Sequence, residues 1–318
     1  MESLSPILSI AVPCYSQIDR ARRCVQSLLD QSFQDFELTL VDDGASDEYR
    51  DYVSSLEDPR VTYHRNPVRL GAMKNIFQAI GRGTSKYSLA FHEDDLLGRH
   101  YLEAAVGILE HQPGCGFVAA ELHEFVDEPS GEMLSRPVGS PVHEQFKSGA
   151  DFLGAIFRGV EPMFGSIVYR RAAIAHVAPP LDHYGTLADR PFLLAILKNW
   201  SAAIVREPLA WYRRHDGPGD PGDDVGRHDT MRVEHILRLF RTYRSTLPHT
   251  QPTRDFFSYS SYWLVALYNL VPPDARPSLR SFLFQAWREG LYDPRGRGGL
   301  GYKQALKAVL GVGARAHA

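Results

Sequence analysis

The chain has little cysteine, no excess of positive charge and no long apolar run. Its three cysteines, Cys14, Cys24 and Cys115, are scattered and form no CxxC pair. This spacing indicates neither a structural zinc site nor a disulfide framework, and a reducing compartment is the simpler interpretation. The formal net charge of −3 over 318 residues provides no electrostatic case for a nucleic-acid partner.

Apolar runs are too short for a membrane span, which needs roughly 18 consecutive apolar residues. The most apolar stretch, residues 262–268, is far shorter, and residues 1–6 lack the basic start and apolar stretch of a signal peptide. We therefore expect a cytoplasmic protein. Peripheral contact with the inner face of a membrane remains a hypothesis, because it needs no spanning segment.

Strand-like and helix-like patterns alternate over residues 7–122. Apolar runs predict strands at residues 7–12, 36–41, 61–63, 87–91 and 117–122, and helical spacing predicts a helix after each of the first four. This alternation predicts an α/β fold with a mainly parallel sheet flanked by helices. Helices near residues 150–157 and 189–197 and strands at 166–169, 202–205 and 209–213 are predicted further on.

Two segments break the periodicity. Prolines and glycines interrupt residues 123–148, which we predict to be a mobile or disordered loop, and residues 217–224 are too rich in Gly, Pro and Asp to be regular. From Met231 the pattern becomes helical and more basic, with helices expected over residues 254–270, 276–289 and 302–310. We predict two domains, a catalytic domain over residues 1–228 and a C-terminal helical region over residues 229–318.

Two acidic clusters follow apolar runs. Asp42 and Asp43 end one predicted strand, and Glu93, Asp94 and Asp95 follow another. Ligands of open α/β sheets bind at the carboxyl ends of the strands, so both clusters can serve one ligand. Closely spaced carboxylates repel unless a cation offsets them, and hard divalent ions bind few carboxylates plus substrate phosphates. The clusters thus predict a metal–phosphate site for Mn²⁺ or Mg²⁺; solvated acidic turns are the alternative.

Short motifs follow one another along the first two thirds of the chain, at residues 10–16, 28–33, 36–38, 41–44, 66–67, 70–72, Asn75, 92–95 and 212–215. This ordered set resembles the family-2 glycosyltransferases of GT-A fold, over roughly residues 7–216. The resemblance implies a Rossmann-like domain that transfers a sugar with inversion, in a metal-dependent, hexosyltransferase-type reaction. The implied donor is a nucleoside-diphosphate sugar, a UDP-sugar by default, and the acceptor is a saccharide or lipid-linked hydroxyl in polysaccharide or glycolipid assembly.

The resemblance also implies roles at the donor site. Pro13 and Tyr15 would lie against the nucleotide base, although Tyr15 could instead pack locally. Asp42 would hydrogen-bond the base, with Asp43 near the ribose or orienting the turn. Gly71 and Lys74 lie near a predicted helix N-terminus that favours phosphate, so both could contact the diphosphate, with a solvated Lys74 as the alternative.

In the second cluster the sequence departs from the family. His92 stands where the family usually has its first aspartate, which leaves either Glu93 or Asp94 for the ribose side and Asp94 or Asp95 for the metal. His215 would complete the metal or diphosphate shell, and Arg214, or Arg213, would neutralise diphosphate charge. Asp47 is expected to cap the next helix instead.

Asp189 is the candidate catalytic residue. By resemblance it is the general base that accepts the proton of the acceptor hydroxyl. A helix N-cap is the alternative role, because Asp is favoured there and Pro191 suits a first turn. Asp182 and Glu161 are reserves.

Two other functions compete with this one. A metal-dependent nucleotidyltransferase would need a Gly-rich basic loop after the first strand, where this chain has residues 12–16 instead. A catalytically inactive GT-A binding module is the second. The C-terminal helices could contact an anionic membrane, or they could form a bundle that packs on the catalytic domain and forms a homodimer. We favour the bundle, because residues 262–270 look buried.

Overall fold

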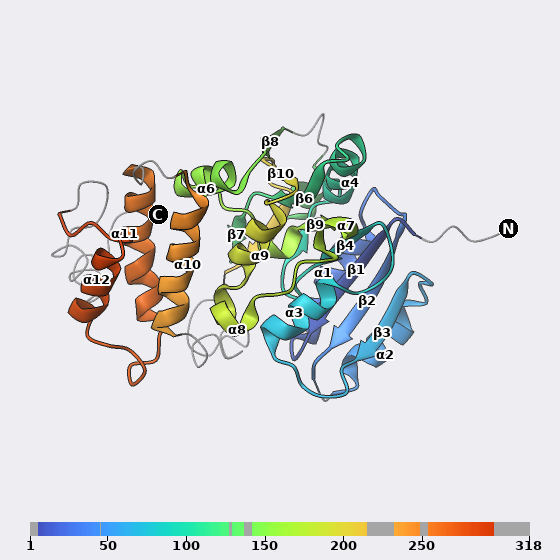
Figure 1. The fold of residues 1–318 in the computed structure, drawn as a ribbon. Coiled ribbons are helices and arrows are strands. Elements are labelled where there is room, and N and C mark those ends of the chain that lie inside the picture. Colours follow the sequence, from blue (N-terminus) through green and yellow to red (C-terminus); the bar gives the residue numbers. More distant parts are fainter. Residues whose placement is uncertain are drawn as a thin grey trace. The chain divides into compact units, whose positions relative to one another are not determined.

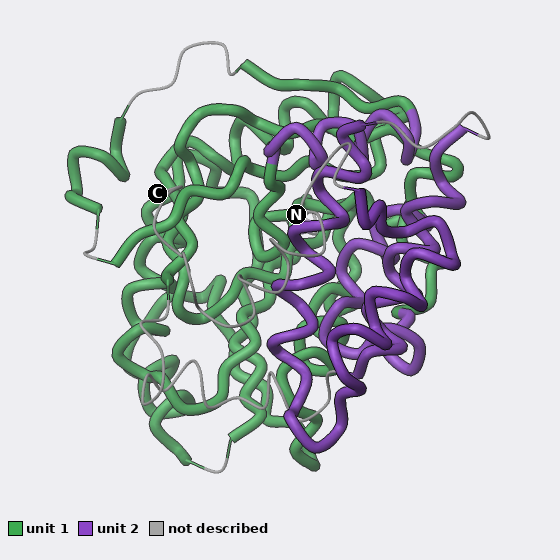
Figure 2. Tube along the Cα trace, turned by 90° about the vertical axis from the view of Figure 1, so that its left-hand side faces the viewer, with its two compact units in different colours: residues 1–147, 161–179, 196–225 green, residues 148–160, 180–195, 226–318 purple. Residues whose placement is uncertain are grey.

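The computed structural model describes residues 6–44, 46–126, 129–136, 142–214, 232–248 and 254–295. They divide into two compact units, coloured in Figure 2. Unit 1 comprises residues 1–147, 161–179 and 196–225, and unit 2 comprises residues 148–160, 180–195 and 226–318. Two segments from within the predicted catalytic domain therefore group with the C-terminal helices.

Unit 1 contains an eight-stranded sheet in the order β3-β2-β1-β4-β9-β6-β10-β8 (Figure 1). Neighbours pair in parallel from β3 to β4 and between β6 and β10, whereas β9 and β8 run antiparallel to their neighbours. The predicted mainly parallel sheet is confirmed. The strands are β1 Leu8–Cys14, β2 Phe36–Asp42, β3 Val61–Arg65, β4 Tyr87–Ala90, β6 Cys115–Ala120, β8 His143–Phe146, β9 Val168–Arg170 and β10 Ser201–Val205.

Four helices connect and cover these strands. They are α1 Ile18–Leu29, α2 Glu48–Leu56, α3 Ala72–Ile80 and α4 Tyr101–His111, close to their predicted positions. Each buries one apolar stripe against the sheet, as helical spacing requires; α1, for example, buries Ala21, Cys24, Val25 and Leu28. Residues of α1, α2 and α4 form a continuous core with β1, β2, β4, β6 and β10.

Residues 123–148 are more regular than predicted. They contain β7 His123–Phe125, α5 Gly131–Ser135 and β8, with residues 127–128 and 137–141 outside the description. β7 pairs with β11 Ala210–Arg213, which also pairs with β5 Leu96–Leu97 in a second, three-stranded sheet. The prediction of an irregular loop was wrong for these elements, because partners distant in sequence supply the strand pairing that Pro and Gly seemed to exclude.

Unit 2 is helical. It comprises α6 Gly149–Phe157, α8 Leu181–Tyr184, most of α9 Asp189–Ile196, α10 Val233–Thr246, α11 Arg254–Asn269 and α12 Leu279–Arg288. The ring of Phe157 lies edge-on to Tyr243 and Phe256 with centroids 6.0 and 5.7 Å apart. The helical prediction for residues 254–270 and 276–289 is confirmed, and the predictions at 217–224 and 302–310 lie outside the described residues.

Within the described part of the chain, no helix is both long and apolar enough to cross a membrane. Short elements that the periodicity did not reveal include η1 Phe164–Ser166, α7 Arg171–Ile174 and η2 Gly185–Leu187. They are single turns, too short to show a helical period.

A buried amide fastens the end of α1 to the start of α4. Gln31 is 1% exposed. Its Nε2 donates to the carbonyls of Ser27 and Gly98 at 3.0 and 2.9 Å, and its Oε1 accepts from the Leu102 amide at 3.1 Å. The Gly98 carbonyl also accepts from the Tyr101 amide at 3.0 Å. Because the Ser27 carbonyl and the Leu102 amide are buried away from water, the Gln31 side chain supplies a hydrogen-bond partner to each of them.

We expect Gln31→Ala to lower the free energy of unfolding by about 2–4 kcal/mol, because it leaves buried backbone groups unsatisfied and opens a small cavity. Urea denaturation measures the change. Gln26→Ala, at an exposed position of α1, is the matched control and should change stability by less than about 0.5 kcal/mol. Equal effects of the two substitutions would contradict this role of Gln31.

Candidate functional site

The two acidic clusters lie at the same edge of the sheet. Strands β3, β2, β1 and β4 are parallel neighbours, so their carboxyl ends meet there. Asp42 pairs with Cys14 in the register of β2 and β1, and the Asn66 amide donates to the Asp42 carbonyl at 2.8 Å. The Phe91 amide donates to the carbonyl of Ala11 at 3.0 Å, which brings the Glu93–Asp95 cluster in beside β1. The structure therefore assembles the edge that the sequence predicted.

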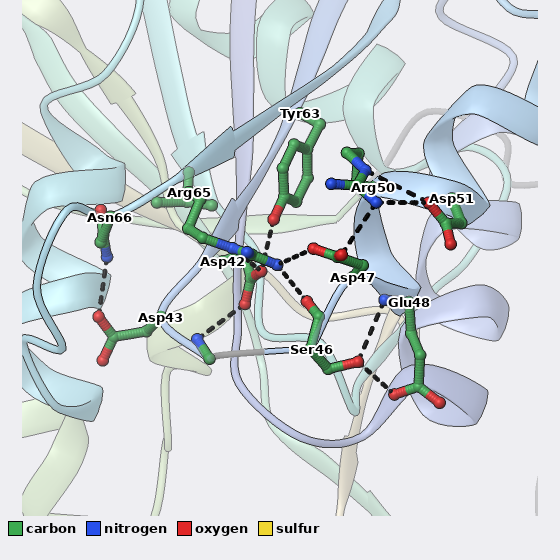
Figure 3. A network of polar contacts seen from close by, with 12 residues as sticks. Asp42, Asp43, Ser46, Asp47, Glu48, Arg50, Asp51, Tyr63, Arg65 and Asn66 are labelled. Atoms are coloured by element: carbon green, nitrogen blue, oxygen red, sulfur yellow. Dashed lines mark hydrogen bonds and ion pairs between the residues drawn. The ribbon is translucent and has the colours of Figure 1, made fainter.

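Asp42 is fully buried at this edge (Figure 3). Its Oδ1 accepts from the Gly44 amide at 2.7 Å. Its Oδ2 accepts from the Tyr63 hydroxyl at 2.6 Å and from Arg65 Nε at 3.2 Å. Arg65 also contacts Asp47 at 3.0 Å. The predicted base-binding carboxylate is thus polarised by a cation and a phenol, both from β3.

Asp43 holds the loop that precedes α3. Its Oδ1 accepts from Asn66 Nδ2 at 2.9 Å and from the Leu70 amide at 2.8 Å, and its Oδ2 accepts from the Gly71 amide at 2.8 Å. Gly71 has a φ of 82°, a conformation that favours glycine. Of the two roles predicted for Asp43, these contacts match the orienting one.

The turn after β2 lies against Tyr15. A Cβ on Gly44 would come within 2.5 Å of the Tyr15 carbonyl oxygen, so only glycine allows this approach. The guanidinium of Arg69 lies over the Tyr15 ring, 4.2 Å from its centroid, a cation–π contact. Tyr15 and Pro13 are both half-buried. A base that stacks on Tyr15 would share the ring with this cation or lie on its other face.

Glu93 is buried beneath Tyr15. Its Oε1 accepts from the Tyr15 amide at 3.0 Å and its Oε2 accepts from the Tyr49 hydroxyl of α2. Burial is the main reason that the pKa of Glu93 is raised to about 7. The hydrogen bonds from Tyr49 and Tyr15 lower the pKa, the nearby carboxylates of Asp94 and Asp42 raise it, and the value of about 7 includes all of these effects. Glu93 therefore ties the ends of β1 and β4 to α2, which suits a supporting role better than contact with a ribose.

Asp95 and Asp94 face different surroundings. Asp95 is fully buried; its Oδ1 accepts from the Arg213 amide of β11 at 2.9 Å, and its Oδ2 lies 3.5 Å from His92 Nδ1. Asp94 is half-buried, and its carbonyl accepts from Arg213 Nε at 3.2 Å. His92, which replaces the family's usual aspartate, is thus a partner of Asp95.

Three further predicted residues have simpler surroundings. Lys74 is exposed in the first turn of α3, and Arg214 is exposed after β11, where its amide donates to the Phe125 carbonyl at 2.9 Å. His215 lies outside the described residues. Within the described ranges, no three His, Cys, Asp or Glu side chains form a group that could hold a metal ion.

Asp189 begins α9, and its Oδ2 lies 3.6 Å from Arg190 Nε. Its side chain is 27% exposed. It belongs to unit 2, whereas the donor-side residues above belong to unit 1. Asp182, a reserve candidate, is exposed in α8, and Glu161 is half-buried in unit 1.

Tyr49, Tyr63 and Arg65 were not predicted from the sequence. Tyr63 and Arg65 alternate along β3 and therefore share a face, which is a signal present in the sequence; their target became evident only once β3 paired with β2. The prediction that Asp47 caps α2 was wrong in its side-chain contact. Asp47 occupies the N-cap position, but it pairs with Arg50 and Arg65, and Ser46 Oγ accepts from the Glu48 amide instead (Figure 3).

Two thiols lie under the edge. Cys24 Sγ of α1 donates to the His92 carbonyl at 3.2 Å, and Cys14 Sγ donates to the Val12 carbonyl at 3.1 Å. Burial, helped by the nearby carboxylates, raises the pKa of both thiols above the ordinary value. All three cysteines are free and buried.

The fold and this edge define an α/β domain of GT-A type. The sequence profile described as "Glycosyl transferase family 2" matches residues 9–161. The crystal structure of S. aureus TarS 1–349 in complex with UDP-GlcNAc superposes with a TM-score of 0.58 at 13% identity, covering 91% of this chain and 85% of that one. The mannosyltransferase PcManGT from Pyrobaculum calidifontis, in complex with GDP-Man and Mn²⁺, gives 0.51 at 15%, covering 90% and 76%.

Relatives in sequence include proteins named as glycosyltransferases. "Putative colanic acid biosynthesis glycosyl transferase WcaA" of Escherichia coli (strain K12) is 28% identical over 141 residues, which is 44% of this chain and 49% of WcaA. The alignment thus spans about half the length of that relative. "Putative glycosyltransferase EpsH" of Bacillus subtilis (strain 168) is 24% identical over 266 residues, 79% of this chain and 72% of EpsH. Residues 9–161 of the chain therefore match glycosyl transferase family 2, and the chain shares the GT-A fold of the solved glycosyltransferases.

The raised pKa of Glu93 predicts a pH dependence of stability. Between about pH 4.5 and about pH 7 the folded protein keeps a proton on Glu93 that the unfolded chain releases. The contribution of Glu93 to the free energy of unfolding is therefore largest near pH 4.5. It decreases by on the order of 3 kcal/mol as the pH rises to about 7. Glu93→Gln should lack this component.

Urea denaturation of the wild type and Glu93→Gln, across that pH window and without divalent ions, measures the difference. Glu132→Gln, an exposed position in α5, is the control with the same change of charge and should keep the wild-type pH profile. Parallel profiles for the wild type and Glu93→Gln would show that Glu93 titrates normally.

Proposed function

We propose that this chain is an inverting glycosyltransferase that moves a sugar from a nucleoside-diphosphate sugar to an acceptor hydroxyl. The observation that carries the proposal is the edge of the sheet where Tyr15, Asp42 and Asp94 lie, within a family-2 domain. TarS and PcManGT, which share the fold, were crystallised with UDP-GlcNAc and GDP-Man respectively. A UDP-sugar is the donor we propose first.

On the donor side, the base stacks on Tyr15 and hydrogen-bonds at Asp42. Asp42 Oδ1 accepts one hydrogen bond, from the Gly44 amide, so its second lone pair can accept from an imide N–H such as uracil offers. Because the Asp42 side chain is fully buried, this contact requires its surroundings to open when the base binds. The amide of Leu70 and that of Gly71 are held by Asp43, so the start of α3 is pre-positioned. Exposed Lys74 in its first turn then adds positive charge for the diphosphate.

The carboxylate oxygens of Asp94 and Asp95 are ligands that suit Mn²⁺ or Mg²⁺. Asp94 and Asp95 supply hard oxygen donors, and such ions commonly use one or two carboxylates and complete their shell with substrate phosphates. We propose Asp94 as the main ligand, because its side chain is half-buried whereas that of Asp95 is fully buried. Asp95 is the second proposed ligand, and His215 is proposed as a further one from the sequence resemblance alone. When bound, the ion would offset the charge of the departing diphosphate.

The chain's own residues perform the transfer by placement and charge. Asp189 accepts the proton of the acceptor hydroxyl, and that oxygen attacks the anomeric carbon on the face opposite the diphosphate, which gives inversion. Arg214 stabilises the negative charge that develops on the leaving diphosphate. The acceptor we propose is a saccharide or a lipid-linked sugar, in polysaccharide or glycolipid assembly, because the relative WcaA is named for colanic acid biosynthesis.

Metal-dependent nucleotidyl transfer and a non-catalytic binding module are the competing functions. The family match and the half-buried Asp94 favour sugar transfer over both. The place of action that we propose is the cytoplasm.

Thermal unfolding with nucleotides tests the donor site. We expect UDP with Mn²⁺ to raise the Tm more than either ligand alone, since a ligand at 100 times its Kd adds about 2.7 kcal/mol. Asp94→Asn should lose the metal-dependent part of the shift, and Asp255→Asn, exposed in α11, should keep it. A larger shift with GDP or dTDP would reassign the base, and no shift with any nucleotide and metal would refute the proposed donor site.

Asp189→Asn should lower kcat by a factor on the order of 10²–10⁴, because the amide cannot accept a proton, and leave donor affinity within about twofold. Asp182→Asn is the matched control and should retain near wild-type kcat. Turnover with a radiolabelled sugar donor and the nucleotide Kd separate the two effects. A loss of turnover in Asp182→Asn alone would move the base to α8, and equal losses of kcat and donor binding would make Asp189 a structural residue.

A further inference from the structure

Exposed aromatic side chains gather in two helices of unit 2. Among the described residues, the exposed large aromatic side chains are Tyr262, Phe284 and Trp287, which lie in α11 and α12. Phe284 and Trp287 are 56% and 50% exposed, and their ring centroids are 5.6 Å apart. The prediction that residues 262–270 are buried was therefore wrong for Tyr262 and Leu270. Paired aromatic rings on a surface indicate a contact site.

Two arginines flank the aromatic pair on α12. Arg280 precedes Phe284 by four residues, and Arg288 follows it by four, so both lie on the same side of the helix as the rings. Both arginines are exposed, and the nearby outward residues, Ser281 and Gln285, carry no charge. We call Arg280, Phe284, Trp287 and Arg288 the α12 stripe. It combines aromatic rings with positive charge and contains no acidic residue.

The opposite side of α12 is occupied by the core of unit 2. Leu279, Phe282, Leu283 and Ala286 are buried, and Phe282 stacks on Tyr268 of α11 with centroids 5.1 Å apart. Glu289, the acidic residue next to the stripe, accepts from Arg241 Nε and Nη2 at 2.8 and 2.9 Å. Its charge is therefore already matched by Arg241, and the stripe keeps its positive character.

The charge of the stripe selects an anionic partner over a second copy of the chain. An isologous dimer would place the same patch on both sides of its interface, which would bring Arg280 and Arg288 against their own copies. The sequence after α12 has the same sign: residues 294–318 contain five Lys or Arg and no Asp or Glu, in a chain of net charge −3. Aromatic rings beside arginines are the composition of helices that lie in the interface of anionic membranes.

We propose that the α12 stripe binds an anionic lipid surface, with Phe284 and Trp287 inserted at the level of the headgroups and Arg280 and Arg288 on the lipid phosphates. This interaction goes beyond sugar transfer and does not depend on it, since it needs no donor, metal or acceptor. Its consequence would be to hold the chain at a membrane surface.

Vesicle flotation of the full chain tests the proposal, with vesicles of phosphatidylcholine alone or mixed with phosphatidylglycerol. We expect binding to the anionic vesicles that decreases with added salt. Arg280→Gln with Arg288→Gln should weaken it about 30-fold, because each arginine contributes about 1 kcal/mol near such a surface. Phe284→Ser with Trp287→Ser should weaken it at least about tenfold. Tyr262→Ser, an exposed aromatic position outside the stripe, is the matched control.

Unchanged circular dichroism and Tm show that each variant is folded, as expected for exposed positions. No binding of the wild type to anionic vesicles would overturn the proposal. Binding that both double variants retain would do so as well, since it would place the contact elsewhere in the chain. A dimer in analytical ultracentrifugation that Phe284→Ser with Trp287→Ser abolishes would instead identify the stripe as a protein interface.

Discussion

Negative charge buried at the carboxyl edge of the sheet is the constraint around which unit 1 is built. A buried carboxylate is unfavourable unless it is hydrogen-bonded or paired, and Asp42, Asp43 and Glu93 are all buried. Their partners come from four separate segments: β3, the loop before α3, the segment after β1, and α2. The same carboxylates that would serve a nucleotide donor therefore hold these segments in register. The edge is pre-organised before any ligand arrives, which reduces the conformational entropy lost on binding.

Much of this arrangement could be predicted from the sequence because it depends on local patterns. Strand and helix periodicity placed β1 to β4 and the intervening helices, and the rule that ligands bind at strand ends placed Asp42 and Asp94 at one edge. The contacts of the carboxylates could not be predicted in the same way. Arg65 reaches Asp42 only because β3 lies next to β2, and strand neighbours are not encoded in periodicity. The same reason explains β7 and β8, whose partners are about 60 to 90 residues away.

Unit 2 shows a related limit for domain boundaries. Helical spacing predicted α10, α11 and α12, but α6 and α8 come from the middle of the chain and pack with them. An apolar stripe predicts that one face of a helix is buried, but it does not predict which element packs against that face. Phe157 illustrates the point. Its ring contacts Tyr243 of α10 and Phe256 of α11, which lie 86 and 99 residues further along the chain. Asp189 therefore stands in the unit that also contains the exposed stripe of α12, whereas the donor-side carboxylates stand in unit 1.

The reactivity of the two thiols beneath the acidic edge can report how often this edge opens. Cys24 donates to the carbonyl of His92, and both Cys14 and Cys24 are buried with raised pKa values. Only a thiolate in contact with solvent reacts with a disulfide reagent, so chemical modification of either cysteine requires the edge to open locally. The modification rate then reports the free energy of that opening, a sub-global event distinct from complete unfolding. A molecule that bridged the two acidic clusters would slow the reaction without touching either sulfur.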